Sequence, residues 1–169
     1  ANYPVEFMAA LLTSEMERTD KIVQYMEECR AMGLRVAPPD VNRSGARFTV
    51  DGDTIRFGLA AIKNVGETAI ESIVQVRQDG GATFASLTDF CARVDLRLLN
   101  RRVLESLIKA GAFDGGGATR AGLLAGLDQA MEAGQRRQRD REEGQASLFD
   151  APAAAPAPVK AERRLGGVP

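Results

Sequence analysis

The residues best suited to binding chemistry in this 169-residue sequence are Asn64, Val65 and Gly66, with Lys63 before them. Apolar residues recur at helical spacing on both sides of this turn: Leu59, Ile62 and Val65 first, then Ile70, Ile73 and Val74. This pattern predicts a helix-hairpin-helix, in which Asn64 and Gly66 take the positive φ of a tight turn. The first N–H groups of the second helix then face an anion, and Lys63 adds a positive charge beside them.

Such a turn suits a phosphate of a nucleic-acid backbone, because backbone amides and a lysine recognise charge and not base sequence. The alternative is an ordinary turn between two helices, since short motifs also occur without function. Glu67 favours that alternative, because it places a carboxylate near the proposed phosphate. On this stretch alone both interpretations stay open.

Arg101 and Arg102 are the second candidate for phosphate contact. They lie in the first turn of a helix that Asn100 begins as N-cap and Gly111 ends as C-cap, with Phe113 folding back on it. The apolar face of this helix consists of Val103, Leu104, Leu107 and Ile108. The two arginines either bind phosphate or belong to a solvated polar face.

The C-terminal part of the chain contains a third candidate, Gln145, Leu148 and Phe149. The residues before it, 136–143, are charged, and residues 151–159 are rich in alanine and proline, which predicts a flexible linker. Two large apolar residues in such a segment indicate docking into a pocket of a partner protein.

The composition excludes several kinds of active site. The chain has no histidine, and its two cysteines, Cys29 and Cys91, lie far apart inside helical patterns. This excludes the usual zinc site, a Cys–His nucleophile and a histidine general base. We expect both cysteines to be small buried residues in a reducing compartment. The carboxylates are scattered, so we predict no catalytic residue and no metal ligands in this chain.

Positioning these candidates requires a mainly α-helical fold. Two helices are predicted between residues 1 and 33. The apolar face of the first consists of Phe7, Met8, Leu11 and Leu12, and that of the second consists of Ile22, Val23, Met26 and Cys29. Alternating runs at 47–50 and 54–57 predict one small β-hairpin, which leads directly into the helix-hairpin-helix. Further helices are predicted from Phe84 onward and over residues 119–139. The net charge of −1 hides basic clusters at 93–102 and 136–141.

Four stretches, in the same order along the chain, resemble the α subunits of bacterial DNA polymerase III, which are the C-family replicative polymerases. They are residues 1–16, Pro-Pro-Asp-Val-Asn at 38–42, Ile-Lys-Asn-Val-Gly-Glu at 62–67, and residues 99–114. Four ordered motifs are far more specific than one. Asn64 stands where that family commonly has glycine, which is tolerable because asparagine enters the left-handed region.

The resemblance implies four parts: the end of the fingers region (1–46), a domain with tandem helix-hairpin-helix motifs that holds product duplex (47–143), a clamp-binding peptide (144–150) and a flexible Ala/Pro-rich tail (151–169). The residues implied to contact the backbone of double-stranded DNA are Lys63, Asn64, Val65, Gly66, Arg101 and Arg102. Gln145, Leu148 and Phe149 are similar to the peptide that docks on the bacterial sliding clamp. Other replisome subunits would bind through regions absent here.

The whole subunit is implied to be a DNA-directed DNA polymerase, a nucleotidyltransferase of DNA replication that needs Mg²⁺. The palm carboxylates are absent from this sequence, so we expect the segment to be inactive alone and without a cofactor. Residues 151–169 do not resemble the family's next segment, which suggests a fragment, a truncated reading frame or an unusual variant. No run of about 18 apolar residues and no signal-peptide pattern occur, so we expect a cytoplasmic protein without membrane contact.

Two alternatives remain open. One is a non-catalytic helical adaptor that binds the clamp, with the helix-hairpin-helix serving only as structure. The other is the error-prone relative of the same polymerase, against which the clamp peptide argues, because a processive replicase has most need of it. Weak, steeply salt-dependent binding to duplex DNA, which drops when Lys63 or Arg101 is neutralised, would separate the replicase from the adaptor.

Overall fold

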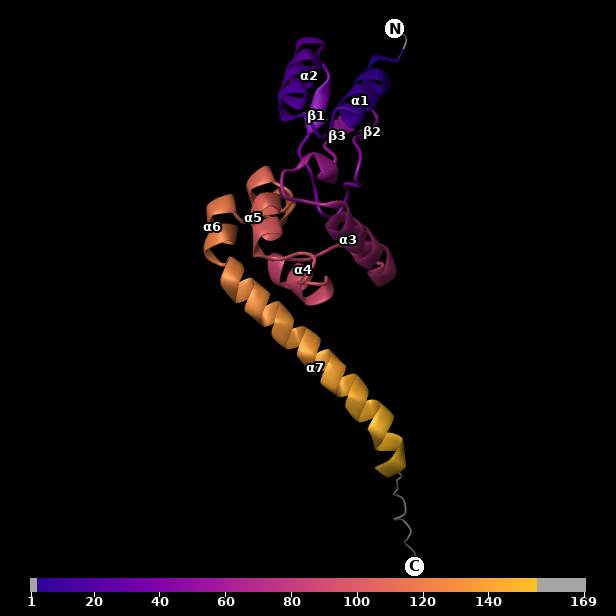
Figure 1. Ribbon diagram of the computed structural model, residues 1–169, viewed down its shortest axis with the longest axis vertical. Helices are drawn as coiled ribbons and strands as arrows, with labels where there is room; N and C mark the ends of the chain where they lie inside the picture. Colours follow the sequence, from indigo (N-terminus) through magenta and orange to yellow (C-terminus); the bar gives the residue numbers. More distant parts are fainter. Residues whose placement is uncertain (1–2, 155–169) are drawn as a thin grey trace, which may run out of the picture.

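The computed structural model describes the backbone of residues 3–154 and the side chains of residues 3–146. Over these residues the fold is mainly α-helical, as predicted. The helices are α1 (Pro4–Ser14), α2 (Thr19–Ala31), α3 (Glu67–Gly80), α4 (Leu87–Arg93), α5 (Arg101–Ala110), α6 (Arg120–Ala125) and α7 (Leu127–Ala154). The strands are β1 (Arg35–Ala37), β2 (Thr49–Asp51) and β3 (Thr54–Arg56), and the 3-10 turns are η1 (Leu59–Ala61) and η2 (Asp114–Gly116). Figure 1 shows α1, α2 and the sheet at one end, α3 to α6 in the middle, and α7 extending away from them.

The N-terminal unit packs α1 and α2 against the small sheet (Figure 1). Its buried residues are Met8, Ala9, Leu12, Ile22, Cys29, Phe48 and Ile55. The two predicted helices are confirmed, but Phe7 and Val23, expected on their apolar faces, are 58% and 51% exposed. Met8 and Leu12 take the buried side of α1, and Phe7 lies about 100° around the helix from Met8.

The predicted β-hairpin is confirmed, with Val50 of β2 opposite Ile55 of β3 in an antiparallel pair. The rings of Phe48 and Phe57 flank it, with centroids 4.8 Å apart. The third strand, β1, was not predicted, and it pairs in parallel with β3. This strand has only three residues and none of them is buried, so it lacks the alternation of apolar and polar residues from which a strand is predicted.

The middle unit has its own hydrophobic cluster, centred on Phe90 of α4. The Phe90 ring lies 4.7 Å from that of Phe84 and 5.1 Å from that of Phe113, measured between centroids. The predicted apolar residues around the first turn and on α5 are buried in this cluster: Leu59, Ile62, Val65, Ile70, Ile73, Val103, Leu104, Leu107 and Ile108. Val74 is only partly buried.

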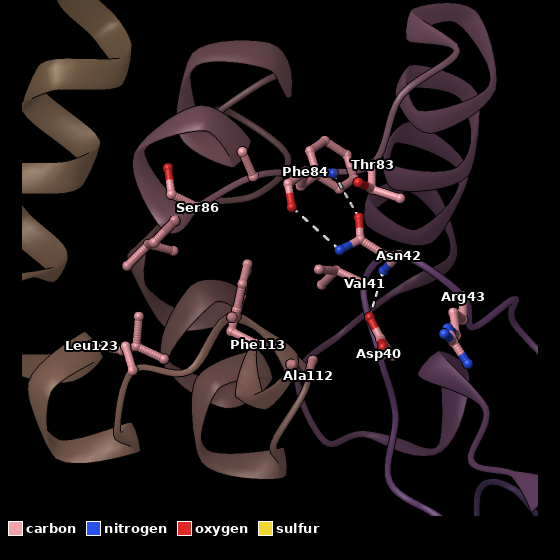
Figure 2. Close-up of a pocket in the computed structure, with 15 residues that line it drawn as sticks. Asp40, Val41, Asn42, Arg43, Thr83, Phe84, Ser86, Ala112, Phe113 and Leu123 are labelled. Carbon is pink, nitrogen blue, oxygen red and sulfur yellow. Dashed lines mark hydrogen bonds between the residues drawn. The ribbon is translucent and has the colours of Figure 1, made fainter.

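A loop at residues 40–44 ties the elements of the middle unit together. The Asn42 side chain accepts a hydrogen bond from the Phe84 amide (2.6 Å) and donates one to the Phe84 carbonyl (3.2 Å), as Figure 2 shows. Arg77 of α3 donates to the carbonyls of Val41 (2.8 Å) and Ser44 (3.0 Å). Burial lowers the pKa of Arg77, because it removes water from the charged guanidinium. The loop is thus held by the Arg77 side chain and by the Phe84 backbone, which both follow it in sequence.

The prediction of one continuous helix over residues 119–139 is wrong, both because the helix is interrupted and because it ends later. It is interrupted at Gly126, so that α6 and α7 are separate helices. Glycine has the poorest helix propensity after proline, which favours a break at this position. The second helix, α7, continues to Ala154 and therefore includes the start of the stretch expected to be a flexible linker. Residues 155–169 lie outside the described residues.

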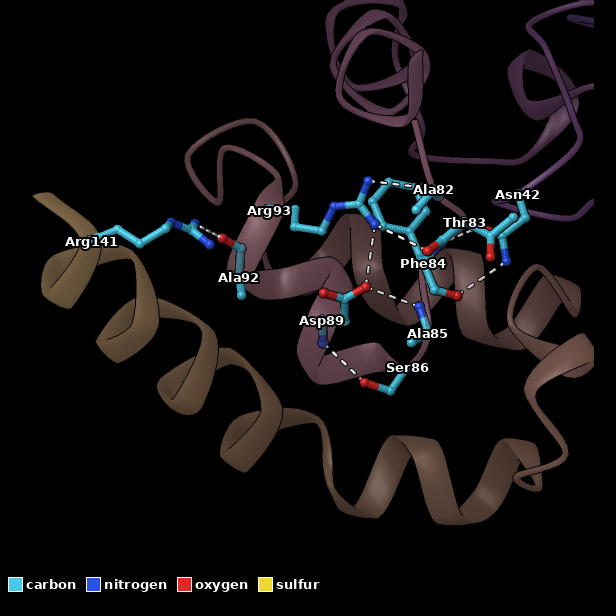
Figure 3. A network of polar contacts seen from close by, with 10 residues as sticks. All are labelled: Asn42, Ala82, Thr83, Phe84, Ala85, Ser86, Asp89, Ala92, Arg93 and Arg141. Carbon is cyan, nitrogen blue, oxygen red and sulfur yellow. Dashed lines mark hydrogen bonds and ion pairs between the residues drawn. The ribbon is translucent and has the colours of Figure 1, made fainter. Parts of the chain in front are cut away.

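The first half of α7 packs on α4. A Cβ placed on Gly134 would lie 2.6 Å from the Cys91 carbonyl carbon and 2.8 Å from the Ala92 nitrogen, so only glycine permits this approach. One turn further on, Gln138 donates hydrogen bonds of 2.8 Å to the carbonyls of Cys91 and Val94. Arg141 donates to the Ala92 carbonyl (Figure 3). These donors satisfy carbonyls that a helix leaves unpaired at its C-terminus.

Both cysteines are buried, as expected, and neither forms a disulfide. Burial raises the pKa of the Cys91 thiol from 9.0 to about 11. Burial, and secondarily the charge of Glu28, raises the pKa of Cys29. Among the described residues, no helix is both long and apolar enough to cross a membrane.

Candidate nucleic-acid interface

The helix that precedes the turn at Lys63–Gly66 is shorter than predicted. The expected helix before it is only the single 3-10 turn η1, because the amides of Leu59 and Ala60 bond the carbonyls of Gly45 and Ala46 at 2.9 and 3.0 Å. Those bonds hold the chain against the loop that precedes β2, and Ile62 returns to extended backbone. The helical spacing of Leu59, Ile62 and Val65 therefore indicated which residues are buried, but these residues do not form a full helix.

Asn64 has the positive φ predicted for the turn, at 73°. The same prediction for Gly66 is wrong, since its φ is −87° and its ψ is 174°. Gly66 is the N-cap of α3, and an N-cap residue takes extended backbone. Asn64 alone reverses the chain, while Val65 is buried and anchors the turn to the core.

Gly66 leaves the N-terminus of α3 without a side-chain cap. The first N–H groups of a helix have no partner within the helix, so here they remain available to an anion. Lys63, Asn64 and Gly66 are exposed around them, and so is Glu67. The N-terminus of α5 differs, because the Asn100 side chain already accepts the Val103 amide at 3.1 Å. The α3 terminus is therefore the more open of the two.

One hydrogen bond links the first predicted group of DNA-contacting residues to α5, the helix that carries the second group. Nδ2 of Asn64 donates to Oγ of Ser106 at 3.1 Å, so the first turn lies against the exposed side of α5. Ser106 lies one helical turn after Arg102. Sequence analysis missed Ser106, because a serine inside a helix carries no signal until its partner is known.

The basic stretch at 93–102 is mostly neutralised by neighbouring carboxylates. Arg93 pairs with Asp89, Arg97 with Asp95, and Arg101 with both Glu105 and Asp128. Figure 3 shows Arg93 stacked over the Phe84 ring and bonded to the carbonyls of Ala82 and Thr83. These arginines therefore organise the chain locally.

Arg97 also holds the carboxylate of its partner in the ionised form. Its guanidinium and its own backbone amide donate hydrogen bonds that lower the pKa of Asp95. Arg102 differs from the other arginines of this stretch. It is exposed, and no carboxylate among the described residues pairs with it.

Of the predicted clamp-binding residues, only the Gln145 side chain is described. It is exposed on α7 and lines a groove of about 900 Å³ between α7, the end of α3 and residues 93–97. The backbone at 148 and 149 is helical, but the side chains of Leu148 and Phe149 lie outside those described. Their role stays a prediction.

A second cavity, of about 520 Å³, lies between the loop at 40–43, residues 83–87 and residues 112–118 (Figure 2). None of the predicted binding residues lines it. Within the described part of the chain, no group of three or more histidine, cysteine or carboxylate side chains could hold a metal ion.

Comparison with known proteins identifies two similarities. A family model described as "Helix-hairpin-helix motif" matches residues 33–123, which is more than half of the chain. Proteins called "DNA polymerase III subunit alpha" match nearly all of it. That of Pasteurella multocida is 49% identical over 150 residues, covering 88% of this chain and 13% of the relative.

Two further relatives carry the same name. The protein of Vibrio cholerae is 46% identical over 169 residues, covering 99% of this chain and 14% of the relative. That of Thermus aquaticus is 51% identical over 150 residues, covering 88% of this chain and 12% of the relative. This chain thus spans about one eighth of the length of these relatives.

Proposed function

Since this chain belongs to the helix-hairpin-helix family and corresponds to a segment of the bacterial DNA polymerase III α subunit, we propose that it binds the backbone of duplex DNA for a replicative polymerase. One observation carries the proposal. The exposed N-terminus of α3, which has no side-chain cap, directly follows Lys63 and Asn64 in the chain. The Asn64 side chain is hydrogen-bonded to the exposed side of α5. Backbone amides and cations on one surface are what a phosphate backbone requires, and no base-reading element is needed.

Fluorescence anisotropy with a labelled 20-base-pair duplex across a salt series tests this proposal. We expect weak binding whose affinity falls steeply with salt, because phosphate contacts release counterions. Lys63→Gln removes one phosphate contact and lowers the slope of log K against log salt by about 1.

Arg30→Gln is the matched control, since Arg30 is exposed at the far end of α2 and the substitution changes the net charge equally. Its slope should equal that of the parent. Binding that is absent or independent of salt would contradict the proposal and favour the helical adaptor.

The segment at 144–150 is the proposed docking site for the sliding clamp. Gln145 is exposed on α7 at the edge of the groove that it lines, where a partner can reach it. Its amide would bond the rim of an apolar pocket that Leu148 and Phe149 fill, because buried aromatic and aliphatic side chains dominate small interfaces. Duplex binding and clamp docking together would keep a polymerase on its template.

Titration calorimetry against a bacterial sliding clamp tests the docking site. The Leu148→Ala/Phe149→Ala variant should lose at least about tenfold in affinity, since the two side chains are the proposed anchors. The control is Phe7→Ala/Val23→Ala, which removes two exposed apolar side chains from the opposite end of the molecule. Equal affinity of parent and tail variant would exclude these residues as the anchor.

The polymerase activity of the longer protein would reside outside this segment. Phosphoryl transfer to a growing strand needs carboxylates that hold Mg²⁺ ions, and the described carboxylates form no such group. We propose that the chain contributes duplex and clamp binding, and that it does not polymerise DNA alone.

A further inference from the structure

The exposed side of α5 carries cations at helical spacing around Ser106. Successive helix residues are about 100° apart, which places Arg102 about 40° and Lys109 about 60° from Ser106, within one arc. Both are exposed. Arg101 lies about 140° from Ser106, on the side where it pairs with Asp128 of α7. The two neighbouring arginines are therefore about 100° apart around the helix, and Arg102 is the one nearer to Ser106.

The Asn64–Ser106 hydrogen bond places the first turn on this same arc. Its length of 3.1 Å is that of an ordinary hydrogen bond, and it joins residues 42 positions apart in sequence. Lys63 directly precedes Asn64, so the turn that carries it is held beside the helix that carries Arg102 and Lys109. No other side-chain hydrogen bond among the described residues connects the turn at 63–66 to α5.

We propose that Ser106 is a positioning residue that holds the Asn64 turn on α5, so that Lys63, Arg102 and Lys109 bind one duplex backbone as a single face. Arg101 is excluded from this face, because Glu105 and Asp128 already engage it at a different angle around the helix. The inference rests on the proposed duplex binding. It assigns Lys109 a contact, distinguishes between the two arginines and gives Ser106 a role.

Salt-dependent binding of the full 169-residue chain to the same labelled duplex tests the face. Arg102→Gln and Lys109→Gln each remove one phosphate contact, so each should lower the salt slope by about 1. Arg30→Gln is again the charge-matched control and should keep the parent slope. Arg101→Gln, with the same change of charge one residue away, should lower the slope less than Arg102→Gln does. An Arg101→Gln slope that falls as far as that of Arg102→Gln would overturn the proposal.

Ser106→Ala tests the positioning. Loss of one hydrogen bond should weaken duplex binding about threefold. Alanine is the best helix former, so α5 itself is not weakened by the change, and circular dichroism should show an unchanged fold. Ser106→Thr keeps the hydroxyl and should restore the parent affinity. Parent-like binding by Ser106→Ala, or failure of Ser106→Thr to restore affinity, would overturn the role of Ser106. No duplex binding by the parent would instead overturn the proposed function.

Discussion

Gly134→Ala is expected to lower the free energy of unfolding by about 2 kcal/mol. The new methyl group would lie 2.6 Å from the Cys91 carbonyl carbon and 2.8 Å from the Ala92 nitrogen. These are backbone atoms that cannot rotate away, so α7 must move off α4, and overpacking of this kind costs about 1–3 kcal/mol or more. The gain in helix propensity, up to about 1 kcal/mol, offsets only part of that cost. Chemical denaturation followed by circular dichroism measures the difference.

Gly144→Ala is the matched control for this substitution. Gly144 lies in the same helix, is exposed, and a Cβ there meets nothing within 4 Å. The control should therefore stabilise the protein by about 0.5–1 kcal/mol through helix propensity alone. If the two variants had the same stability, α7 would not pack on α4 through Gly134.

The contact between α4 and α7 also makes stability depend on alkaline pH. Burial raises the pKa of the Cys91 thiol from 9.0 to about 11, because the thiolate cannot be solvated there. The folded state therefore retains a proton that the unfolded chain releases. The stability contributed by the neutral thiol is complete below pH 9 and is lost as pH rises to about 11, a total of about 3 kcal/mol.

Denaturation of the parent and of Cys91→Ala between pH 8 and pH 11 measures this loss. Cys91→Ala should be less stable than the parent at pH 8, since it loses buried contacts, and the difference should shrink as pH rises. Cys29→Ala is a second test of the same effect. Burial also raises the pKa of Cys29, so this variant should show the same trend more weakly. A constant difference between parent and Cys91→Ala would contradict the buried, protonated thiol.

The proposed clamp peptide follows directly after this contact between α4 and α7. Gln138 and Arg141 bond carbonyls at the end of α4, and Gln145 lies one turn beyond Arg141 on the same helix. The part of α7 that precedes Gln145 is thus attached to the middle unit. Any partner bound at 144–150 would be held at a defined distance from the proposed DNA-binding face, because a helix is a rigid spacer.

The sequence by itself determined the elements that depend on neighbours along the chain. Asn100 and Gly111 begin and end α5, Asn64 reverses the chain, and apolar residues at helical spacing mark what is buried. These features follow from local propensity and periodicity, which a linear sequence contains. The resemblance of four ordered motifs indicated the polymerase subunit, and the comparisons agree.

Only the tertiary structure decided which of these residues meet. It shortened the helix before Asn64 to one 3-10 turn, because residues 45 and 46 offer carbonyls to that segment. It joined Asn64 to Ser106, and it paired Arg101 with Asp128 while leaving Arg102 exposed. Each of these contacts joins residues far apart in sequence, and no local pattern encodes such a contact. The identity of the cations that face a ligand is therefore a property of the fold.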